Sequence, residues 1–360
     1  MRYLVVPSKE TESWKDFLVS NEWLERGHSI QIEKENRALP LTTTFPEIIP
    51  PELSKFNIIE KEVLDLNPPN YLGFLEREIG EKTFAELKLF WPQSFDQIGE
   101  NIIVKIEKEV EHFAKEIAQS MLLKNTKATR VFQDLGVRGD FRIRELKPLA
   151  GATHLGGETK IKENGMEFFV DPTKGYYSPR LATERLETLE CALILQKKLG
   201  RKLNVCDAYA GFGPALITLL KEQDLINSIL ANDLNHEITN TLEKNLMKAT
   251  KENIPLKIEC MDARKLIEIP ENRNLYDFLL VNIPHSTLEH LPSLIGLLNN
   301  NSKSVLRAWA IIDSTEIENL KIEINEVFDS LEYSISRISV AAARSYSPTQ
   351  IYAKIEVWIN

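Results

Sequence analysis

The stretch that decides the fold is Asn204-Val-Cys-Asp-Ala-Tyr-Ala-Gly-Phe-Gly-Pro214. It begins with a short apolar run, which is typical of a buried parallel strand, and Asp207 stands where that strand would end. Small residues and glycines follow. Pro214 then takes the preferred first-turn position of a helix that continues Ala-Leu-Ile-Thr-Leu-Leu. The pattern predicts a strand, a glycine-rich turn and a helix whose free N–H groups can face a ligand.

The glycine spacing in this turn differs from that of the two common nucleotide-binding loops. The dinucleotide fingerprint needs G-x-G-x-x-G and the phosphate loop needs G-x-x-x-x-G-K-[ST], whereas only Gly211-x-Gly213 is present. An acidic residue just before the turn disfavours a phosphate and favours an ammonium group. The sequence D-x-x-x-G-x-G resembles the cofactor loop of class I S-adenosylmethionine methyltransferases. The alternative interpretation is a tight strand–helix turn that binds no ligand.

Three further apolar runs follow, and they end at Asp233, Asp262 and Asn282. The carboxyl ends of parallel strands meet at one edge of an open α/β sheet, where such sheets bind ligands. Asp233 comes about twenty residues after the glycine-rich turn, the separation expected of a residue that binds a ribose. Any one of these side chains could merely cap a helix, but four in register favour a nucleoside site.

Composition and charge set the broad class of the protein. The 360 residues are 27% charged and 43% hydrophobic, which is ordinary for a soluble protein of two or three domains. No apolar run approaches the roughly twenty residues that span a bilayer, and the N-terminus lacks a signal-peptide cleavage site, so we expect a cytoplasmic protein without a membrane. The six histidines form no H-x-x-x-H pair and no cluster with cysteine, so we expect no metal. The three cysteines are expected to be buried free thiols.

The net charge of −9 argues against nonspecific binding of nucleic acid through overall positive charge. Its distribution is uneven, because residues 121–185 carry twelve lysines and arginines against eight aspartates and glutamates. A moderately basic patch on an acidic body can hold an RNA. An ordinary solvated surface remains the alternative explanation.

The order of the predicted elements divides the chain into three units and one linker. Residues 1–41 form a small α/β module, 42–54 a proline-rich linker, 55–177 a middle α/β unit and 178–360 a Rossmann-like domain. Asn164-Gly165 predicts a hairpin turn. The last two predicted strands, 334–340 and 351–359, have a short connection, so the last strand should be antiparallel.

Two arginine-containing segments lie around the start of the last unit. In the strand predicted at residues 142–144, Arg142 and Arg144 share one face. In the helix predicted to begin after Ser178, Arg180 and Glu184 are spaced i and i+4. Taken alone, that spacing indicates a simple surface salt bridge worth a few tenths of a kcal/mol.

Five stretches of the chain form a distinctive set: Arg142-Ile-Arg-Glu-Leu146 with Ala150-Gly151, Tyr177-Ser-Pro-Arg-Leu-Ala-Thr-Glu-Arg185, Asp207-Ala-Tyr-Ala-Gly-Phe-Gly-Pro214, Asn282-Ile-Pro284 and Arg344-Ser-Tyr-Ser-Pro348. Together they resemble one family, the archaeal and eukaryotic tRNA (guanine-37-N1)-methyltransferases. The resemblance covers nearly the whole chain. It implies an α/β fold, a class I methyltransferase sheet with an antiparallel last strand, preceded by a middle RNA-binding domain and a small N-terminal module. The related wybutosine-pathway aminocarboxypropyl transferases share this fold and cofactor.

The resemblance implies roles for three residues. Glu184 would be the general base that removes the guanine N1 proton, Arg144 would steady the charge that develops on guanine O6, and Asn282 would touch both cofactor and base. Guanine N1 carries a proton and is a poor nucleophile, so such an enzyme must supply a base and an electrostatic partner. The target base must also leave its stack.

The resemblance further implies a cofactor, a partner and their contacts. The cofactor would be S-adenosyl-L-methionine, with Asp207 facing the methionine moiety, Asp233 the ribose and Asp262 the adenine. The partner would be the anticodon-loop region of tRNA, bound by a monomer. The residues expected to bind the cofactor are Arg180, Arg185, Asp207, Tyr209, Ala210, Gly211, Gly213, Asp233, Leu234, Asp262, Ala263, Asn282 and Pro284. The residues expected to bind RNA are Arg138, Arg142, Arg144 and Lys147.

Some positions depart from the family pattern. Ile283 replaces a leucine, Arg307-Ala-Trp-Ala-Ile311 stands where a histidine- and tyrosine-rich stretch is expected, His236 replaces a proline, and Tyr352 replaces a histidine. Other functions therefore stay open. They are aminocarboxypropyl transfer or methylation on a wyosine precursor, a catalytically silent RNA-binding protein, and a small-molecule methyltransferase.

Overall fold

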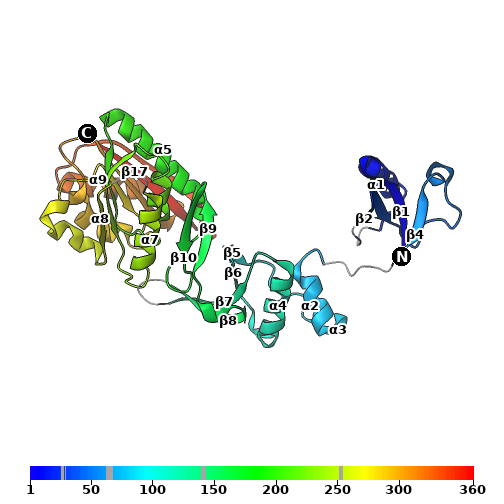
Figure 1. Cartoon of the computed structure of the whole chain (residues 1–360). Helices are drawn as coiled ribbons and strands as arrows, with labels where there is room; N and C mark the ends of the chain where they lie inside the picture. The colour runs from blue at the N-terminus through cyan, green and yellow to red at the C-terminus, as the bar shows by residue number, and fades with distance from the viewer. Residues whose placement is uncertain (26–27, 29, 62–67, 139–142, 251–253) are drawn as a thin grey trace. The chain divides into compact units, whose positions relative to one another are not determined.

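The structure, a computed structural model, describes the whole chain except residues 26–27, 29, 62–67, 139–142 and 251–253 (Figure 1). It divides into two compact units, Met1–Gly80 and Glu81–Asn360. Each unit has its own hydrophobic core and sheet. Among the described residues, no helix combines the length and the apolar character needed to cross a membrane.

The first unit is built on a four-stranded antiparallel sheet with the order β2-β3-β1-β4. Its elements are β1 (Arg2–Pro7), η1 (Ser8–Glu10), α1 (Thr11–Ser20), β2 (Gln31–Glu33), β3 (Asn36–Pro40), η2 (Pro51–Leu53), β4 (Asn57–Glu60) and α2 (Tyr71–Ile79). This unit extends beyond the module expected at residues 1–41. Phe45 and Leu53, from the stretch expected to be a linker, are buried in its core, and β4 pairs with β1. The prolines of this stretch fix its backbone, while its apolar side chains close the core.

The second unit begins with a small mixed sheet, ordered β5-β6-β7-β8. The elements of this part are α3 (Glu81–Glu86), β5 (Asp96–Ile98), β6 (Asn101–Val104), η3 (Lys108–Phe113), α4 (Ala114–Lys124), β7 (Arg130–Arg138), β8 (Ile143–Gly151) and η4 (Thr153–Leu155). The helical segment here starts as the 3-10 helix η3 and becomes α-helical only from Ala114. Strands β6 and β7 are parallel, and the other neighbours are antiparallel.

A β-hairpin connects this sheet to the larger one. Strands β9 (Thr159–Glu163) and β10 (Met166–Val170) pair around Asn164 and Gly165, whose φ angles are 51° and 86°. Both angles are positive, as a type I′ turn requires, so the hairpin expected from the Asn-Gly signal is confirmed.

The rest of the chain forms a seven-stranded sheet with helices on both faces. Its strands are β11 (Leu203–Asp207), β12 (Ile226–Asn232), β13 (Leu256–Glu259), β14 (Phe278–Val281), β15 (Ser304–Asp313), β16 (Ile335–Ser345) and β17 (Gln350–Ile359). Its α-helices are α5 (Ala182–Leu199), α6 (Pro214–Leu219), α7 (Thr239–Ala249), α8 (Thr287–Leu294) and α9 (Ile317–Ser330). The 3-10 helices are η5 (Pro179–Leu181), η6 (Ala263–Glu268), η7 (Pro270–Asn272) and η8 (Ile295–Leu297).

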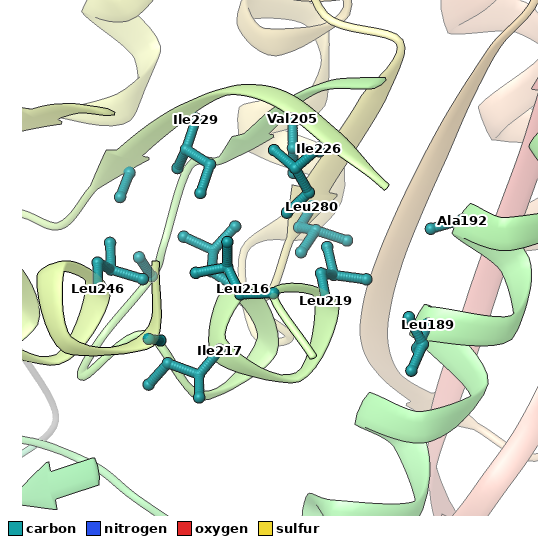
Figure 2. Packing of buried hydrophobic residues seen from close by; sticks show 14 of the residues in the cluster. Leu189, Ala192, Val205, Leu216, Ile217, Leu219, Ile226, Ile229, Leu246 and Leu280 are labelled. Atoms are coloured by element: carbon teal, nitrogen blue, oxygen red, sulfur yellow. The ribbon is translucent and has the colours of Figure 1, made fainter. Parts of the chain in front are cut away.

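Two hydrophobic clusters fill the space on either side of this sheet. Because strand side chains alternate between faces, Val205 joins the cluster that includes α5, α6 and α7, and Cys206 joins the cluster that includes α8 and α9. Figure 2 shows Leu216 of α6 between Leu246 of α7 and Leu219 of α6, with Leu189 of α5 beyond Leu219. Burying each such leucine contributes about 1.5–3 kcal/mol to the free energy of folding, so the helices on both faces stabilise the sheet.

Strand order places a switch point at the middle of the sheet. The order is β13-β12-β11-β14-β15-β17-β16, so the chain proceeds outward from β11 in one direction and from β14 in the other. The first five of these strands pair in parallel, and β17 runs antiparallel to both of its neighbours. The expected Rossmann-like sheet with an antiparallel last strand is thus confirmed. Such switch points leave a crevice at the carboxyl ends of the strands, here those of β11 and β14.

Candidate active site

A cavity of about 50 Å³ lies at the switch point. It is lined by Leu181, Glu184, Arg185, Thr188, Asp207, Tyr209, Ala210, Pro214, Ala215, Leu280, Asn282, Trp309 and Tyr352. Six of these residues were expected from the sequence to bind cofactor or react. The remainder, among them Trp309 and Tyr352, were not expected at the site.

The glycine-rich turn beside the cavity is held by backbone hydrogen bonds and one carboxylate. Ala210 N donates to Asn232 O at 2.8 Å, and Gly211 N donates to Asp233 Oδ2 at 2.8 Å. Asp233 Oδ1 also accepts from Asn235 N at 3.0 Å. Each oxygen of this carboxylate keeps a second lone pair, so Asp233 can still accept hydrogen bonds from ribose hydroxyls.

Gly213 must be a glycine for two reasons, and this gives a stability prediction. Its φ is +81°, and a Cβ there would lie 2.9 Å from Leu242 Cδ1 and 3.3 Å from Leu246 Cδ2. We expect Gly213→Ala to lower the free energy of unfolding by about 1–3 kcal/mol, measured by urea denaturation. Gly200→Ala is the matched control, because Gly200 has φ +67° but open space around it. Equal losses in the two variants would show that packing against α7 is irrelevant.

Two buried asparagines that the sequence did not single out hold the strand ends and the turn in place. Asn232 Nδ2 donates to Ala208 O at 3.0 Å and to Met261 O at 3.1 Å, so it connects the ends of three neighbouring strands. Asn245 Nδ2 donates to Phe169 O at 2.7 Å and to Phe212 O at 3.0 Å, which joins α7 to β10 and to the glycine-rich turn. Buried polar side chains are hydrogen-bonded. The available signal for Asn232 was a polar residue at the end of an apolar run, whereas Asn245 stands in a helix of mixed polarity and gave no such signal.

Asp207 is the most deeply buried carboxylate of the cavity. Only 3% of its surface is exposed, and Tyr209 N donates to its Oδ1 at 3.2 Å. Burial raises the pKa of Asp207 to about 7, partly offset by the Tyr209 backbone hydrogen bond and reinforced by the negative charge of Asp233. A bound cation would favour the charged form, so the site suits an ammonium or sulfonium group.

Asp262, expected to bind the adenine amino group, is paired within the chain. Arg264 Nη2 donates to its Oδ2 at 2.8 Å, and Arg264 N donates to its Oδ1 at 3.0 Å. This hydrogen bonding to Arg264 lowers the pKa of Asp262. Of the other two residues expected near the nucleoside, Ala263 is buried and Leu234 is 50% exposed.

Glu184 and Asn282 face the cavity and are each held by one aromatic donor. Trp309 Nε1 donates to Glu184 Oε2 at 3.2 Å, and Tyr352 Oη donates to Asn282 Oδ1 at 2.9 Å. Glu184 is in the first turn of α5, and Asn282 directly follows β14. Near Asn282, Pro284 O accepts a hydrogen bond from the Ile311 backbone at 2.8 Å.

Arg185 lines the cavity but is also part of a buried network. Its Nη1 donates to Glu163 Oε2 at 2.6 Å, and its Nη2 donates to Ser178 O at 3.2 Å. Tyr177 Oη donates to the same Glu163 oxygen at 2.7 Å. The guanidinium therefore fixes the segment that leads into α5 and with it the position of Glu184.

Arg144, expected to contact the substrate, and Arg180, expected to bind the cofactor, lie outside the cavity lining and share one carboxylate. Arg144 Nη1 donates to Asp96 Oδ2 at 3.0 Å, and Arg180 Nη2 donates to Asp96 Oδ1 at 2.8 Å. Arg180 therefore pairs with β5 and not, as its spacing suggested, with Glu184. Lys147 is exposed on β8. Arg142 and the side chain of Arg138 lie outside the described residues.

The sequence was then compared with known proteins. Residues 75–154 match the TYW2 N-terminal domain, and residues 159–341 match the TRM5/TYW2 methyltransferase domain. The chain belongs to the TRM5/TYW2 methyltransferase family. This confirms the expected family and enzyme class, an S-adenosylmethionine-dependent methyltransferase.

Members of the TRM5/TYW2 methyltransferase family match over most of the chain. The tRNA (guanine(37)-N(1))-methyltransferase Trm5b of Pyrococcus abyssi is 30% identical over 99% of this chain and 98% of its own. Trm5b of Methanocaldococcus jannaschii is 28% identical over 78% of each chain. The crystal structure of the Pyrococcus abyssi protein superposes with a TM-score of 0.70 at 26% identity, covering 100% of this chain and 99% of that one.

The residues at the switch point fit the cofactor of the TRM5/TYW2 family. Asp207 offers a buried carboxylate to a cationic amino-acid tail, and Asp233 keeps hydrogen-bond acceptors for the ribose. Gly211 leaves open space at the turn, since a Cβ built there would meet no atom closer than 4.0 Å.

Among the described residues no group of three or more histidine, cysteine, aspartate or glutamate side chains could hold a metal ion. Cys191 and Cys206 are buried free thiols as expected, but Cys260 is exposed, because it follows the end of β13.

Proposed function

We propose that the protein transfers a methyl group from S-adenosylmethionine to N1 of guanosine at position 37 of tRNA. The observation that carries the proposal is the Glu184 carboxylate, which faces a cavity shared with Asp207 and Asn282. The names of relatives that match most of the chain, tRNA (guanine(37)-N(1))-methyltransferases, support this substrate.

Guanine N1 carries a proton and is a poor nucleophile, so residues of the protein would have to remove that proton. When bound, S-adenosylmethionine supplies a methyl group on a sulfonium, which leaves as a neutral thioether. Glu184 would accept the N1 proton as N1 forms its bond to the methyl carbon and the carbon–sulfur bond breaks. General-base assistance of this kind contributes roughly 10²–10⁴-fold to the rate.

Arg144 would stabilise the negative charge that develops on guanine O6. Among the described residues its contacts to Asp96 and Asp134 use only Nη1, so Nε and Nη2 can meet a carbonyl oxygen. A guanidinium that is already held by Asp96 is preorganised for such a contact. The target base would leave its stack to reach this position.

The part of the chain that matches the TYW2 N-terminal domain would hold the anticodon-loop region of the tRNA. Its strand β8 carries both Arg144 and the exposed Lys147. Arg138 and Arg142 are proposed to contribute from the same segment. A monomer would suffice, because every group named in this chemistry comes from one chain.

An incubation with methyl-labelled S-adenosylmethionine tests the proposal. The purified protein is given unmodified tRNA transcripts that carry guanosine or adenosine at position 37, and the nucleosides are then analysed. We expect labelled N1-methylguanosine from the guanosine transcript alone. Methylthioadenosine release on tRNA with a wyosine precursor, without methyl transfer to the guanosine transcript, would instead indicate aminocarboxypropyl transfer.

A further inference from the structure

The proposed base Glu184 and its cavity neighbour Asn282 each accept a hydrogen bond from one aromatic residue of the large sheet. Trp309 Nε1 donates to Glu184 Oε2 at 3.2 Å, and Tyr352 Oη donates to Asn282 Oδ1 at 2.9 Å. We propose that Trp309 and Tyr352 position Glu184 and Asn282 for methyl transfer. This inference rests on the proposed function and adds two positioning residues to it.

The placement of the two aromatic residues explains why they can act together. Trp309 is on β15 and Tyr352 is on the neighbouring β17, where it pairs with Ile311. Paired residues and residues two apart on a strand share one face, so both rings project toward α5. They pack with Leu181 into a separate small cluster, in which 4% of Trp309 and 3% of Tyr352 is exposed. Burial leaves each ring one orientation, and the two donors are therefore fixed.

The chemistry of the indole suits it to hold a general base. An indole N–H donates only, so Trp309 can neither take the proton from guanine nor return it. It occupies Oε2 of Glu184 and leaves Oε1 to receive the N1 proton. A base held by one oxygen keeps its second oxygen at a fixed distance from the reacting atom, and a misplacement of about 1 Å can cost roughly 10²-fold in rate.

The hydrogen bond from the Tyr352 hydroxyl sets the orientation of the Asn282 amide, and with it the end of the amide that faces the substrate. This donation to Oδ1 orients the amide oxygen toward Tyr352, and the two Nδ2 hydrogens remain for an acceptor. Asn282 is itself exposed, so this hydrogen bond is what orients it. A carbonyl oxygen of the target base is the acceptor that this arrangement selects.

Single-turnover methylation of the tRNA transcript, with cofactor and tRNA affinities measured separately, tests the inference. We expect Trp309→Phe to lower the single-turnover rate roughly 10- to 100-fold while both affinities stay within about twofold of wild type. Trp358→Phe is the matched control. Trp358 is also a buried tryptophan of this sheet, but its Nε1 donates to Glu356, away from the cavity. It should retain the wild-type rate.

Double-mutant cycles separate positioning from general packing. If Trp309 acts through Glu184, Trp309→Phe should cost nothing further in a Glu184→Gln background. Tyr352→Phe removes a single oxygen and leaves the ring, so it tests the inference even if Trp309→Phe fails to fold. It should lower the rate of the wild type and leave the rate of Asn282→Ala unchanged.

The outcomes distinguish this inference from the proposed function. A wild-type rate in Glu184→Gln would overturn the proposed base and the inference with it. Large losses in Glu184→Gln and Asn282→Ala, with Trp309→Phe and Tyr352→Phe as fast as Trp358→Phe, would overturn the inference alone. Additive losses in the double mutants would likewise show that the aromatic residues act independently of Glu184 and Asn282.

Discussion

Glu184→Gln should lower the single-turnover rate of guanosine methylation by roughly 10²–10⁴-fold while the affinity for S-adenosylmethionine stays nearly unchanged. The amide keeps the size of the carboxylate and can still accept from Trp309 Nε1, so the geometry of the cavity is preserved. What it loses is the ability to take a proton. The loss therefore falls on the chemical step, and cofactor binding serves as the internal reference.

Glu187→Gln provides the matched control for this substitution. Glu187 is three residues further along α5, and its carboxylate pairs with Lys354 outside the cavity lining. We expect it to keep a rate within about twofold of wild type, because this partly exposed carboxylate does not line the cavity. Equal rates in the two variants would mean that Glu184 is a structural residue and that another group removes the proton.

The sequence predicted well those parts of the site whose structure is determined by residues close together in the chain. The strand ending at Asp207, the glycine-rich turn and the helix from Pro214 follow from residues adjacent in the chain. The antiparallel last strand followed from a short connection. Such features depend on neighbours within a few residues, which a single sequence contains.

The partners of the charged groups could not be predicted, because they come from distant segments. Arg180 pairs with Asp96, 84 residues earlier, although Glu184 stands at the favourable i+4 position. Trp309 lies 125 residues after Glu184. In the sequence it is an ordinary apolar residue of a strand, and only the folded sheet places its indole N–H against the Glu184 carboxylate. Hydrogen bonds of this range depend on the register of strands that only the fold defines.

Asp207→Asn should have opposite effects on the free protein and on cofactor binding. Burial raises the pKa of Asp207 from 3.8 to about 7. The folded protein therefore binds this proton more tightly than the unfolded chain. The stabilisation is fully present below pH 4 and is lost as the pH rises through 7. Because asparagine carries no charge, the variant should escape this loss, which is on the order of 4 kcal/mol by pH 8.

The measurement is the free energy of unfolding by urea between pH 5 and 8, without cofactor. The difference between Asp207→Asn and wild type should grow with pH, in favour of the variant. Asp224→Asn is the control, because Asp224 is an exposed carboxylate paired with Lys202. A difference that does not vary with pH would contradict the burial of an ionisable group at this position.

Although Asp207→Asn should be more stable than wild type at high pH, it should bind the cofactor more weakly. In the proposed complex the charged Asp207 meets the ammonium of S-adenosylmethionine. Wild-type affinity should then weaken up to about tenfold for each pH unit below 7, whereas the variant should show no such dependence. Losing one partner of a buried charge pair costs about 2 kcal/mol or more, so the variant should bind at least about thirtyfold more weakly at pH 8. If the proposed contact is made, the desolvated carboxylate that destabilises the free protein is the group that binds the cofactor, and a substitution that stabilises the fold at this position should weaken cofactor binding.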